Sequence, residues 1–328
     1  MHDDSGAPPQ VTVAICTWNR ADLLDITLEH LSRLVPPAAG RWELLVVDNA
    51  STDRTPEVLR RWGEGPLPLR CITEPRQGLS HARNAAVMAA RGRYIVWTDD
   101  DVCVSPGWLG AYQAAFRAHP GAVLFGGPIR PRFLGRPPGW LLRGIESVST
   151  AYALRDFGAA AIPLDADHLP FGANMAFRAD ALSSCAFDPA LGRVGSALLS
   201  GEEIALMAGL LEDGGTGWWV PEAAVEHLIP QERQTLRYLG GYYAAWGRSS
   251  HRIRGREPGR RQFLGAPLWL WRQTMEAHAG YLATRPSAPA SIWLRHYCNM
   301  MVHRGRLGSY REESRAGLTP AQTTPTSS

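Results

Sequence analysis

The chain passes from an apolar strand-like run to an acidic cluster at Tyr94-Ile95-Val96-Trp97-Thr98-Asp99-Asp100-Asp101. Strand ends in an open α/β sheet are where ligands bind. Three adjacent carboxylates repel one another, so the cluster is stable only when a cation or a set of hydrogen-bond donors accepts the charge. Mg²⁺ and Mn²⁺ fit this role, because they take oxygen ligands and combine carboxylates with substrate phosphates. The alternative is a solvated acidic turn or a first helical turn, where Asp is also favoured.

Strands and helices alternate around this stretch. Such alternation indicates βαβ units and a mostly parallel sheet in an α/β fold. The expected strands are continuously apolar, which is typical of a sheet that helices cover on both faces. We expect strands at residues 11–16, 44–47, 69–72 and 94–98, and helices at residues 21–34, 55–62 and 81–90.

The second half of the chain is less regular. Residues 128–170 are rich in Pro, Gly and Arg and are expected to be irregular. A helix is expected at residues 202–211 and a last strand at residues 223–229. Residues from 235 to about 300 contain many aromatic and arginine side chains and are expected to be helical.

The composition excludes several classes of site. The chain has 328 residues, 45% of them hydrophobic, which is enough for one large domain or for one domain with an appendage. It contains no lysine, which excludes a Walker A phosphate loop and a lysine Schiff base. Its five cysteines are scattered without CxxC spacing, which indicates a reducing cytosol rather than a disulfide framework or a zinc site.

The apolar segments predict a cytoplasmic location. The N-terminus is polar and gives no indication of a signal peptide. The longest apolar run, residues 263–271, contains Gly265 and Pro267 and is too short to span a bilayer.

Charge is distributed unevenly along the chain. Residues 1–230 hold 19 Arg against 26 acidic residues, whereas residues 231–315 hold 15 Arg against 5. The basic region also contains Trp246, Trp269 and Trp293, and Arg with Trp matches the chemistry of an anionic membrane surface. No nucleic-acid recognition module is present in the sequence, so we expect peripheral binding at the inner face of a membrane rather than nucleic-acid binding. The alternatives are a solvated basic helix and an acceptor-binding surface.

The turn after the first strand is unusual for a nucleotide-binding fold. No GxGxxG motif is present there, which gives a Rossmann dinucleotide site little support. The turn reads Thr17-Trp18-Asn19-Arg20, in which Trp18 can stack on a base and Arg20 can bind phosphate. Core packing is the alternative for Trp18, and a solvated position at a helix start is the alternative for Arg20.

Seven short motifs follow one another over residues 10–250. They are VAICTWNR at residues 13–20, VVDNASTD at 46–53, GLSHARN at 78–84, GRYIVWTDDD at 92–101, FGANM at 171–175, GEE at 201–203 and VEH at 225–227. Each motif alone is weak, but their order and spacing are specific. Together they make the chain resemble a family 2 glycosyltransferase with a GT-A fold.

The resemblance implies a nucleotide-sugar donor site at the strand ends. Asp48 would accept an N–H of the base, and Arg76 or Arg83 would lie near the diphosphate. A helix–sheet salt bridge is the alternative for Arg83. In the DxD-type motif, Asp101 would bind the metal, Asp99 would lie nearer the ribose, and Asp100 would lie toward the sugar. The implied donor-binding residues are Thr17, Trp18, Asn19, Arg20, Asp48, Arg76, Arg83, Asp99 and Asp100.

The resemblance also implies a catalytic base and a metal site. Glu202 and Glu203 are the candidate bases, and the second carboxylate of the family's motif maps to Glu203, where the family usually has Asp. The alternative is a capping box, in which Glu203 bonds the backbone N–H of Ser200. Mn²⁺ or Mg²⁺ would be held by Asp101, Asp99 and His227, although a lone His at a strand end is often structural.

The implied reaction is the inverting transfer of a sugar from a nucleotide-diphosphate sugar to an acceptor hydroxyl. The expected donor is a UDP-sugar. The sequence does not identify the acceptor, and a lipid-linked glycan is one candidate. Competing hypotheses are a metal-dependent phosphohydrolase, which would need more metal ligands, and a basic lipid- or nucleic-acid-binding protein. The expected domains are a flexible lead at residues 1–9, a GT-A domain at 10–234, a helical basic region at 235–315 and a disordered tail at 316–328.

Overall fold

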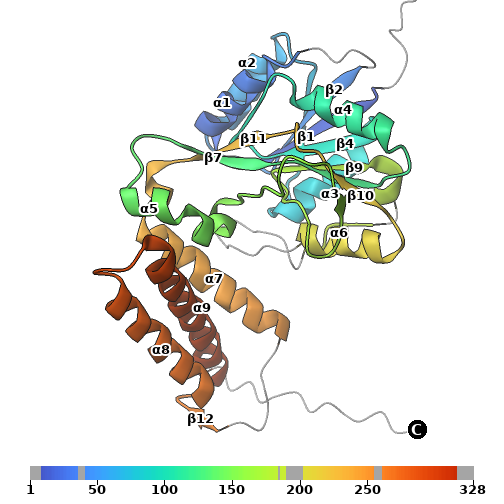
Figure 1. The fold of residues 1–328 in the computed structure, drawn as a ribbon. Helices are drawn as coiled ribbons and strands as arrows, with labels where there is room; N and C mark the ends of the chain where they lie inside the picture. Colours follow the sequence, from blue (N-terminus) through green and yellow to red (C-terminus); the bar gives the residue numbers. More distant parts are fainter. Residues whose placement is uncertain (1–8, 36–40, 184, 190–201, 255–260, 316–328) are drawn as a thin grey trace, which may run out of the picture. The chain divides into compact units, whose positions relative to one another are not determined.

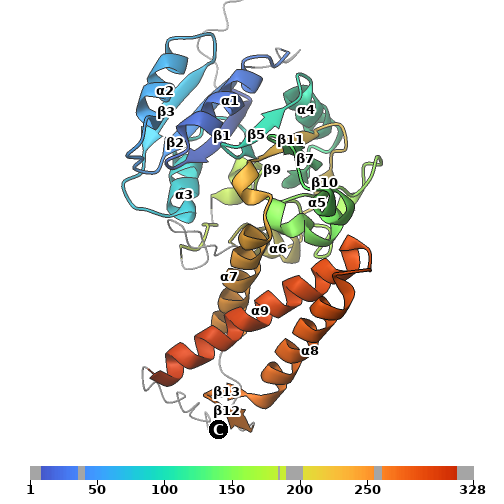
Figure 2. The same ribbon diagram turned by 90° about the vertical axis from the view of Figure 1, so that its left-hand side faces the viewer.

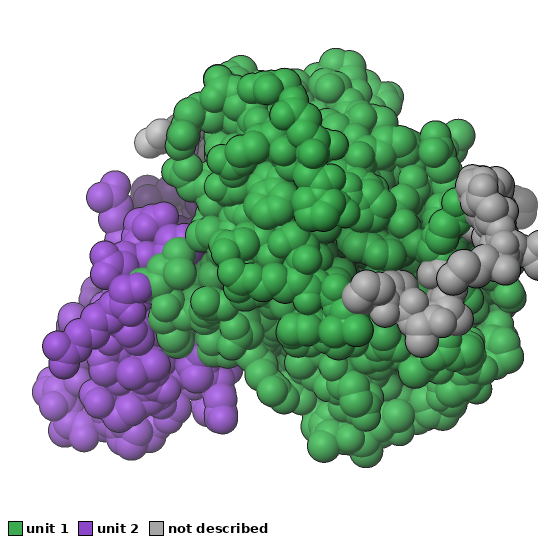
Figure 3. All heavy atoms as spheres, turned by 90° about the horizontal axis from the view of Figure 1, so that it is seen from above, with its two compact units in different colours: residues 1–134, 152–229 green, residues 135–151, 230–328 purple. Residues whose placement is uncertain are grey.

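The structure is a computed structural model, and it describes residues 9–35, 41–183, 185–189, 202–254 and 261–315. The chain divides into two compact units (Figure 3). Residues 1–134 and 152–229 form unit 1, and residues 135–151 and 230–328 form unit 2.

Unit 1 is built on an eight-stranded sheet with the strand order β3-β2-β1-β4-β9-β6-β10-β8 (Figure 1). The strands β1 to β4 pair in parallel, whereas β9 runs antiparallel to its neighbours β4 and β6. Since β2 and β3 lie on one side of β1 and β4 lies on the other, the chain reverses its direction of progression between β1 and β4. Such a reversal is the topological switch point at which α/β sheets bind ligands. The strands are β1 (Val11–Thr17), β2 (Trp42–Asp48), β3 (Leu69–Thr73), β4 (Tyr94–Thr98), β6 (Leu124–Gly126), β8 (Pro163–Leu164), β9 (Asn174–Arg178) and β10 (Gly217–Trp219).

Helices cover both faces of this sheet (Figures 1 and 2). Alternate residues of β1 face opposite sides: Val13 and Ile15 pack in the core with α1, α2 and α4, whereas Ala14 packs in the core with α3 and α6. Because both faces are buried, the central strands have apolar residues at successive positions. The helices are α1 (Ala21–Leu31), α2 (Thr55–Gly63), α3 (Leu79–Ala89), α4 (Trp108–Ala118) and α6 (Glu202–Glu212).

A second, three-stranded sheet holds β11 (Val225–Ile229) between β5 (Val102–Val104) and β7 (Ile129–Phe133). The strand β5 begins directly after Asp101, and β11 runs antiparallel to it with His227 opposite Val102. The backbone N–H of Leu228 donates to the carbonyl of Asp101 at 2.8 Å. This pairing brings His227 beside the acidic cluster, although the two segments are far apart in the sequence.

The buried side chain of Asn174 ties several segments together near this second sheet. Its Oδ1 accepts from Trp108 Nε1 at 2.9 Å and from the Tyr112 hydroxyl at 2.8 Å. Its Nδ2 donates to the carbonyls of Pro128 at 3.0 Å and Ala223 at 2.7 Å. Asn174 therefore fixes the segments that lead into β7 and β11.

Unit 2 is helical. Its long helix α9 (Ala290–Arg315) packs against α5 (Gly139–Gly144), α7 (Leu236–Arg254) and α8 (Leu268–Thr284) (Figure 2). A hairpin of β12 (Gln262–Phe263) and β13 (Ala266–Pro267) precedes α8. Over the ranges that the structure describes, no helix combines the length and the apolar character needed to cross a membrane.

The predicted α/β fold class with a mostly parallel sheet is confirmed, and β4 has the predicted bounds. The prediction that residues 128–170 are irregular is wrong in part, because they contain β7, α5, β8 and the 3₁₀ segment η1 (Ile145–Tyr152). The strand β7 contains Pro131 and two Arg residues, a composition that is tolerated because β7 is an edge strand. Residues 135–151, which were expected in the first domain, belong to unit 2, where Gly144 lies against Ala290 and Leu294 of α9.

Candidate active site

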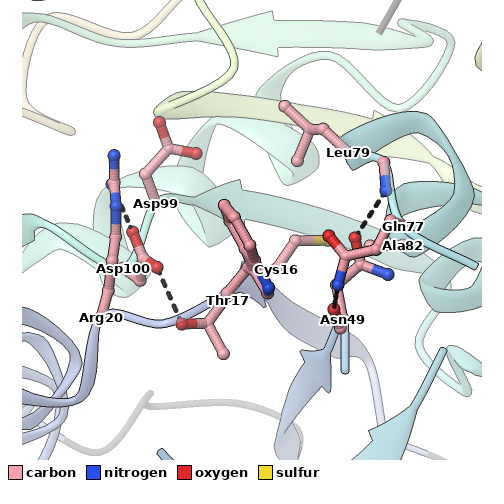
Figure 4. Close-up of a pocket in the computed structure, with 11 residues that line it drawn as sticks. Cys16, Thr17, Arg20, Asn49, Gln77, Leu79, Ala82, Asp99 and Asp100 are labelled. Atoms are coloured by element: carbon pink, nitrogen blue, oxygen red, sulfur yellow. Dashed lines mark hydrogen bonds and ion pairs between the residues drawn. The ribbon is translucent and has the colours of Figure 1, made fainter. Parts of the chain in front are cut away.

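The acidic cluster lies at the switch point between β1 and β4, where its charges are held by donors from β1 and the turn after it. Thr17 donates its hydroxyl to Asp100 Oδ2 at 2.8 Å. Arg20 Nη1 donates to Asp100 Oδ1 at 2.8 Å and to Asp101 Oδ2 at 2.9 Å. Figure 4 shows the Asp100 carboxylate between Arg20 and Thr17. The structure thus joins four residues that the sequence predicted for the donor and metal sites.

The carboxylates of the cluster still repel one another although Arg20 pairs with two of them. Burial raises the pKa of Asp100, and the neighbouring charges of Asp101 and Asp99 raise it further, against the opposite effect of Arg20. Asp100, in turn, raises the pKa of Arg20. Because the carboxylates lie so close together, the site favours additional positive charge.

His227 and Asp101 form a pair of potential metal ligands. His227 Nδ1 lies 2.6 Å from the carbonyl oxygen of Tyr152. A carbonyl can only accept, so Nδ1 carries a proton and Nε2 is directed toward Asp101. The distance from Nε2 to Asp101 Oδ1 is 3.1 Å. A proton shared by Nε2 and Oδ1, or a metal ion bound to both, gives each of these buried atoms a partner.

The geometry of this pair fits a divalent ion. Two neighbouring ligands of an octahedral ion lie about 3 Å apart when each metal–ligand distance is about 2.1 Å. In the described part of the chain, no group of three or more His, Cys, Asp or Glu side chains is arranged to hold a metal ion by itself. Mg²⁺-type ions usually complete their coordination with substrate phosphates and water. Asp101 and His227 therefore fit an ion that is shared with a bound diphosphate.

A cleft lies beside the acidic cluster and contains most of the predicted donor residues. Trp18 lines the cleft and is 36% exposed, so its side chain is accessible to a ligand. Asp99 also lines the cleft, rather than joining the pair formed by Asp101 and His227. The lining consists of Cys16, Thr17, Trp18, Arg20, Asn49, Gln77, Gly78, Leu79, Ala82, Asp99 and Asp100 (Figure 4).

Asn49 organises one wall of this cleft, although the sequence analysis assigned it no role. Its Nδ2 donates to the carbonyls of Glu74 at 2.9 Å and Arg76 at 2.7 Å. Its Oδ1 accepts from the backbone N–H of Gly78 at 2.8 Å. The only sequence signal was its position directly after Asp48, within the motif at residues 46–53.

Asn19 and Asp48 shape the turns around the cleft. Asn19 has a positive φ of 52°, and its Oδ1 accepts from the backbone N–H of Thr52 at 2.7 Å. Asp48 is buried at the end of β2, and its Oδ1 accepts from the backbone N–H of Ser51 at 3.0 Å. The amide of Asn19 is therefore engaged with the neighbouring turn, outside the cleft lining.

Arg76 lies outside the cleft lining and is 68% exposed. Its guanidinium donates to Glu74 at 2.9 Å and 3.1 Å. This hydrogen bonding lowers the pKa of Glu74 to about 2. Arg76 is therefore anchored at the rim by a carboxylate partner.

Arg83 is buried and pairs with both candidate bases. Its Nη1 lies 2.7 Å from Glu202 Oε1 and 3.3 Å from Glu203 Oε2. The salt bridge therefore joins α3 to α6. The alternative considered for Arg83 from the sequence was a salt bridge between its helix and the sheet. Gly172 makes room for the guanidinium, because a Cβ at this position would lie 2.1 Å from Arg83 Nη2. Ser200 lies outside the described residues, and so does the predicted capping box.

The two glutamates differ in environment. The Glu202 side chain is 1% exposed, whereas that of Glu203 is 13% exposed. Burial raises the pKa of Glu202 to about 7, and the negative charge of Glu203 adds to the effect. The pair therefore changes its charge near neutral pH, while Glu203 is the more accessible carboxylate.

Replacing Glu202 with Gln should flatten the pH dependence of stability. Because the folded-state pKa is raised from 4.5 to about 7, the protonated form stabilises the fold fully below pH 4.5 and this contribution is lost as the pH rises through about 7. Gln cannot ionise, so the difference in Tm between about pH 5 and about pH 8 should be smaller than in the wild type by about 5 °C. Thermal unfolding at both pH values measures this, with the exposed Glu226→Gln as a control that keeps the wild-type profile. A wild-type profile in Glu202→Gln would contradict the assigned shift.

Comparison with known proteins identifies sequence relatives over most of unit 1. The family model described as glycosyl transferase family 2 matches residues 12–185. The succinoglycan biosynthesis protein ExoM of Rhizobium meliloti (strain 1021) is 28% identical over 235 residues, which cover 70% of this chain and 70% of that protein. The glucosyl-dolichyl phosphate glucuronosyltransferase of Haloferax volcanii is 24% identical over 243 residues, which cover 70% and 72%, respectively.

Two solved structures share the fold of this chain. The mannosyltransferase PcManGT from Pyrobaculum calidifontis, in complex with GDP-Man and Mn²⁺, has a TM-score of 0.52 and 22% identity, covering 97% of this chain and 78% of that one. TarS 1–349 of S. aureus has a TM-score of 0.52 and 15% identity, covering 95% and 93%. At these identities the similarity is one of fold.

Proposed function

The chain belongs to glycosyl transferase family 2, and we propose that it transfers a sugar from a UDP-sugar to an acceptor hydroxyl with inversion at the anomeric carbon. The observation that carries this proposal is the joining of Thr17, Arg20, Asp100, Asp101 and His227 at the switch point of the sheet. A diphosphate-bound ion fits there, and an open cleft lies directly beside it.

The donor occupies the cleft in this proposal. Trp18 stacks on the base, and Asp48 accepts a base N–H through the carboxylate oxygen that Ser51 does not use. Asp99 binds the ribose, and Asp100 lies toward the sugar. Asn19 and Asn49 act indirectly, by holding the turns that form the cleft walls.

Asp101 and His227 would hold Mn²⁺ or Mg²⁺, which supplies positive charge against the diphosphate of the leaving group. Support comes from the 3.1 Å separation of their facing atoms, and from the Mn²⁺ in the mannosyltransferase of the same fold. Arg20 keeps the two carboxylates in place and balances part of their charge.

Glu203 acts as the general base. It takes the proton of the acceptor hydroxyl while the hydroxyl oxygen forms a bond to the anomeric carbon. The bond between that carbon and the diphosphate oxygen breaks, and its electron pair leaves with the nucleotide. Arg83 positions Glu203 and Glu202 at the start of α6 through a buried ion pair.

The acceptor in this proposal is a lipid-linked glycan at the cytoplasmic face of a membrane. The Haloferax relative carries the name of a transferase for glucosyl-dolichyl phosphate, which is a lipid-linked sugar. The excess of Arg in residues 231–315 provides the charge for peripheral binding to anionic lipid.

Thermal unfolding with candidate donors tests the donor assignment. A ligand at about 100 times its Kd stabilises a protein by about 2.7 kcal/mol, which raises Tm by about 5 °C in a chain of this size. We expect this shift with a UDP-sugar and Mn²⁺ together, and a smaller one when EDTA replaces the ion. A matching shift with GDP-sugars alone would contradict the choice of nucleotide. Release of phosphate without sugar transfer would instead support a phosphohydrolase.

A further inference from the structure

The hairpin before α8 carries a large apolar residue where a polar or small one is favoured. The turn between β12 and β13 has a positive φ at Leu264, 50°, and at Gly265, 79°. Two-residue hairpins with positive φ at both positions prefer Asn, Asp or Gly, because a branched side chain is strained there. Leu264 is also 60% exposed, so it gains little from burial within the fold. Folding alone therefore gives no reason for a leucine at this tip.

The base of the hairpin is anchored, so the tip is presented in a defined position. Ala266 is fully buried in a core that also contains Leu270 and Tyr310. Trp271 Nε1 donates to the carbonyl of Phe263 at 2.9 Å. The Phe263 side chain is 54% exposed and lies edge-on to the Trp271 ring, with 5.8 Å between the ring centroids.

The outer face of α8 continues this apolar surface. Leu268, Met275 and Leu282 recur every seven residues and are 46%, 67% and 60% exposed, respectively. Residues at this spacing share one face of a helix. The opposite, buried face holds Leu270 and Ala277. The helix is thus apolar both toward the core of unit 2 and toward solvent.

A basic groove runs beside this face. It has a volume of about 430 Å³, and its lining contains Arg304, Arg311 and His278 but no carboxylate. The Arg311 guanidinium lies over the Trp271 ring at 4.9 Å from the centroid, so the groove and the hairpin share one aromatic residue. The exposed carboxylate of Glu276 on α8 is paired with Arg272.

We propose that this surface docks unit 2 onto an anionic phospholipid membrane, with the hairpin tip and outer face of α8 in the interfacial layer and lipid phosphates in the basic groove. The docking surface comprises Phe263, Leu264, Leu268, Met275, Leu282, His278, Arg304 and Arg311. Apolar side chains on a projecting edge, next to arginines, are the chemistry by which interfacial helices bind anionic bilayers.

The charge balance favours lipid over a second copy of the chain. The groove lining holds Arg304 and Arg311 and no carboxylate, so two such surfaces repel one another when they face each other. An anionic bilayer instead attracts the arginines and accepts the apolar tip. The proposal rests on the peripheral membrane binding in the proposed function and names its surface, and the vesicle test below is independent of sugar transfer.

Co-sedimentation of the full-length protein with vesicles tests the proposal. We expect pelleting with phosphatidylglycerol-containing vesicles at low salt, release at high salt, and little pelleting with pure phosphatidylcholine vesicles. Leu264→Asn should lower the vesicle partition coefficient by about tenfold while leaving Tm unchanged or higher, because Asn tolerates the positive φ. Arg304→Gln should lower it by about fivefold for anionic vesicles.

Matched substitutions in unit 1 serve as controls. Met88→Gln removes an apolar side chain that is 86% exposed, and Arg60→Gln removes an arginine that is 72% exposed. Both should pellet like the wild type. Wild-type partitioning of Leu264→Asn, or failure of the wild type to pellet with anionic vesicles, would overturn the proposal. So would loss of pelleting in millimolar phosphate at matched ionic strength, since the groove would then bind the free anion.

The alternative occupant of this surface is a second copy of the chain, and the oligomeric state in solution tests it. If light scattering shows a dimer that Leu264→Asn dissociates, and vesicles do not compete with it, then the surface binds a second copy and the membrane proposal is wrong. A monomer that pellets with anionic vesicles supports it.

Discussion

Replacing Asp101 with Asn should lower kcat/KM for sugar transfer by about 10²–10³-fold and weaken the dependence on Mn²⁺ or Mg²⁺. Asp101 Oδ1 faces His227 Nε2 at 3.1 Å, and the pair would hold the ion against the donor diphosphate. Asn retains the shape of the side chain but loses the charge that attracts the ion. Steady-state kinetics across a Mn²⁺ titration measures both effects. The wild type should lose its activity in EDTA and regain it when Mn²⁺ is restored.

Stability separates this effect from a folding defect. Arg20 still pairs with Asp100 when Asp101 is replaced, so the variant should stay folded at the assay temperature, and its Tm is measured beside the kinetics. Glu226→Gln is the matched control, because Glu226 is adjacent to His227 in β11 but is 53% exposed and pairs with Arg132. Full wild-type activity in EDTA, or an Asp101→Asn variant with wild-type kinetics, would contradict the proposal that Asp101 binds a metal ion needed for transfer.

Replacing Glu203 with Gln should lower kcat by about 10²–10⁴-fold with little change in donor affinity. Gln cannot accept the acceptor's proton, but its carbonyl oxygen can still accept from Arg83, whose Nη1 lies 3.3 Å from Glu203 Oε2. The local structure should therefore persist while the chemical step slows. Single-turnover rates and the donor Kd, measured on the same preparation, separate chemistry from binding.

Glu202→Gln is the natural comparison for this variant. If it loses activity while Glu203→Gln remains active, the roles of the two carboxylates are reversed. If both variants keep wild-type turnover, the start of α6 does not supply the base. The raised pKa of Glu202 makes the comparison sharper at high pH, where the wild-type pair carries its full charge.

The first half of the fold could be predicted from the sequence because its signals are local. The strand β4 is rich in apolar and aromatic residues and ends directly before Asp99, so its bounds follow from composition alone. The strand β7 could not be predicted, because Pro131 and its neighbouring arginines are acceptable only at the edge of a sheet that long-range pairing creates.

The candidate site also combines residues that local signals predict with residues that long-range contacts bring together. Arg20 and the Asp cluster were predicted from their positions at strand ends, and Thr17 from the family resemblance. The structure joins Thr17 and Arg20 to Asp100 and Asp101 by hydrogen bonds. The pairing of Arg83 with Glu202 and Glu203 was not predicted, since it joins helices α3 and α6 across the fold. The role of Asn49 was missed because it holds backbone groups, which carry no sequence signature.

The pairing of β11 with β5 restricts the length of the loop that joins β10 to β11. Side chains alternate in direction along a strand, so a one-residue slip of β11 would replace His227 beside Asp101 with Glu226 or Leu228. The loop before β11 cannot absorb such a change easily, because Ala223 is buried and accepts from Asn174 at 2.7 Å. Insertions and deletions between β10 and β11 should therefore displace His227 from its place beside Asp101.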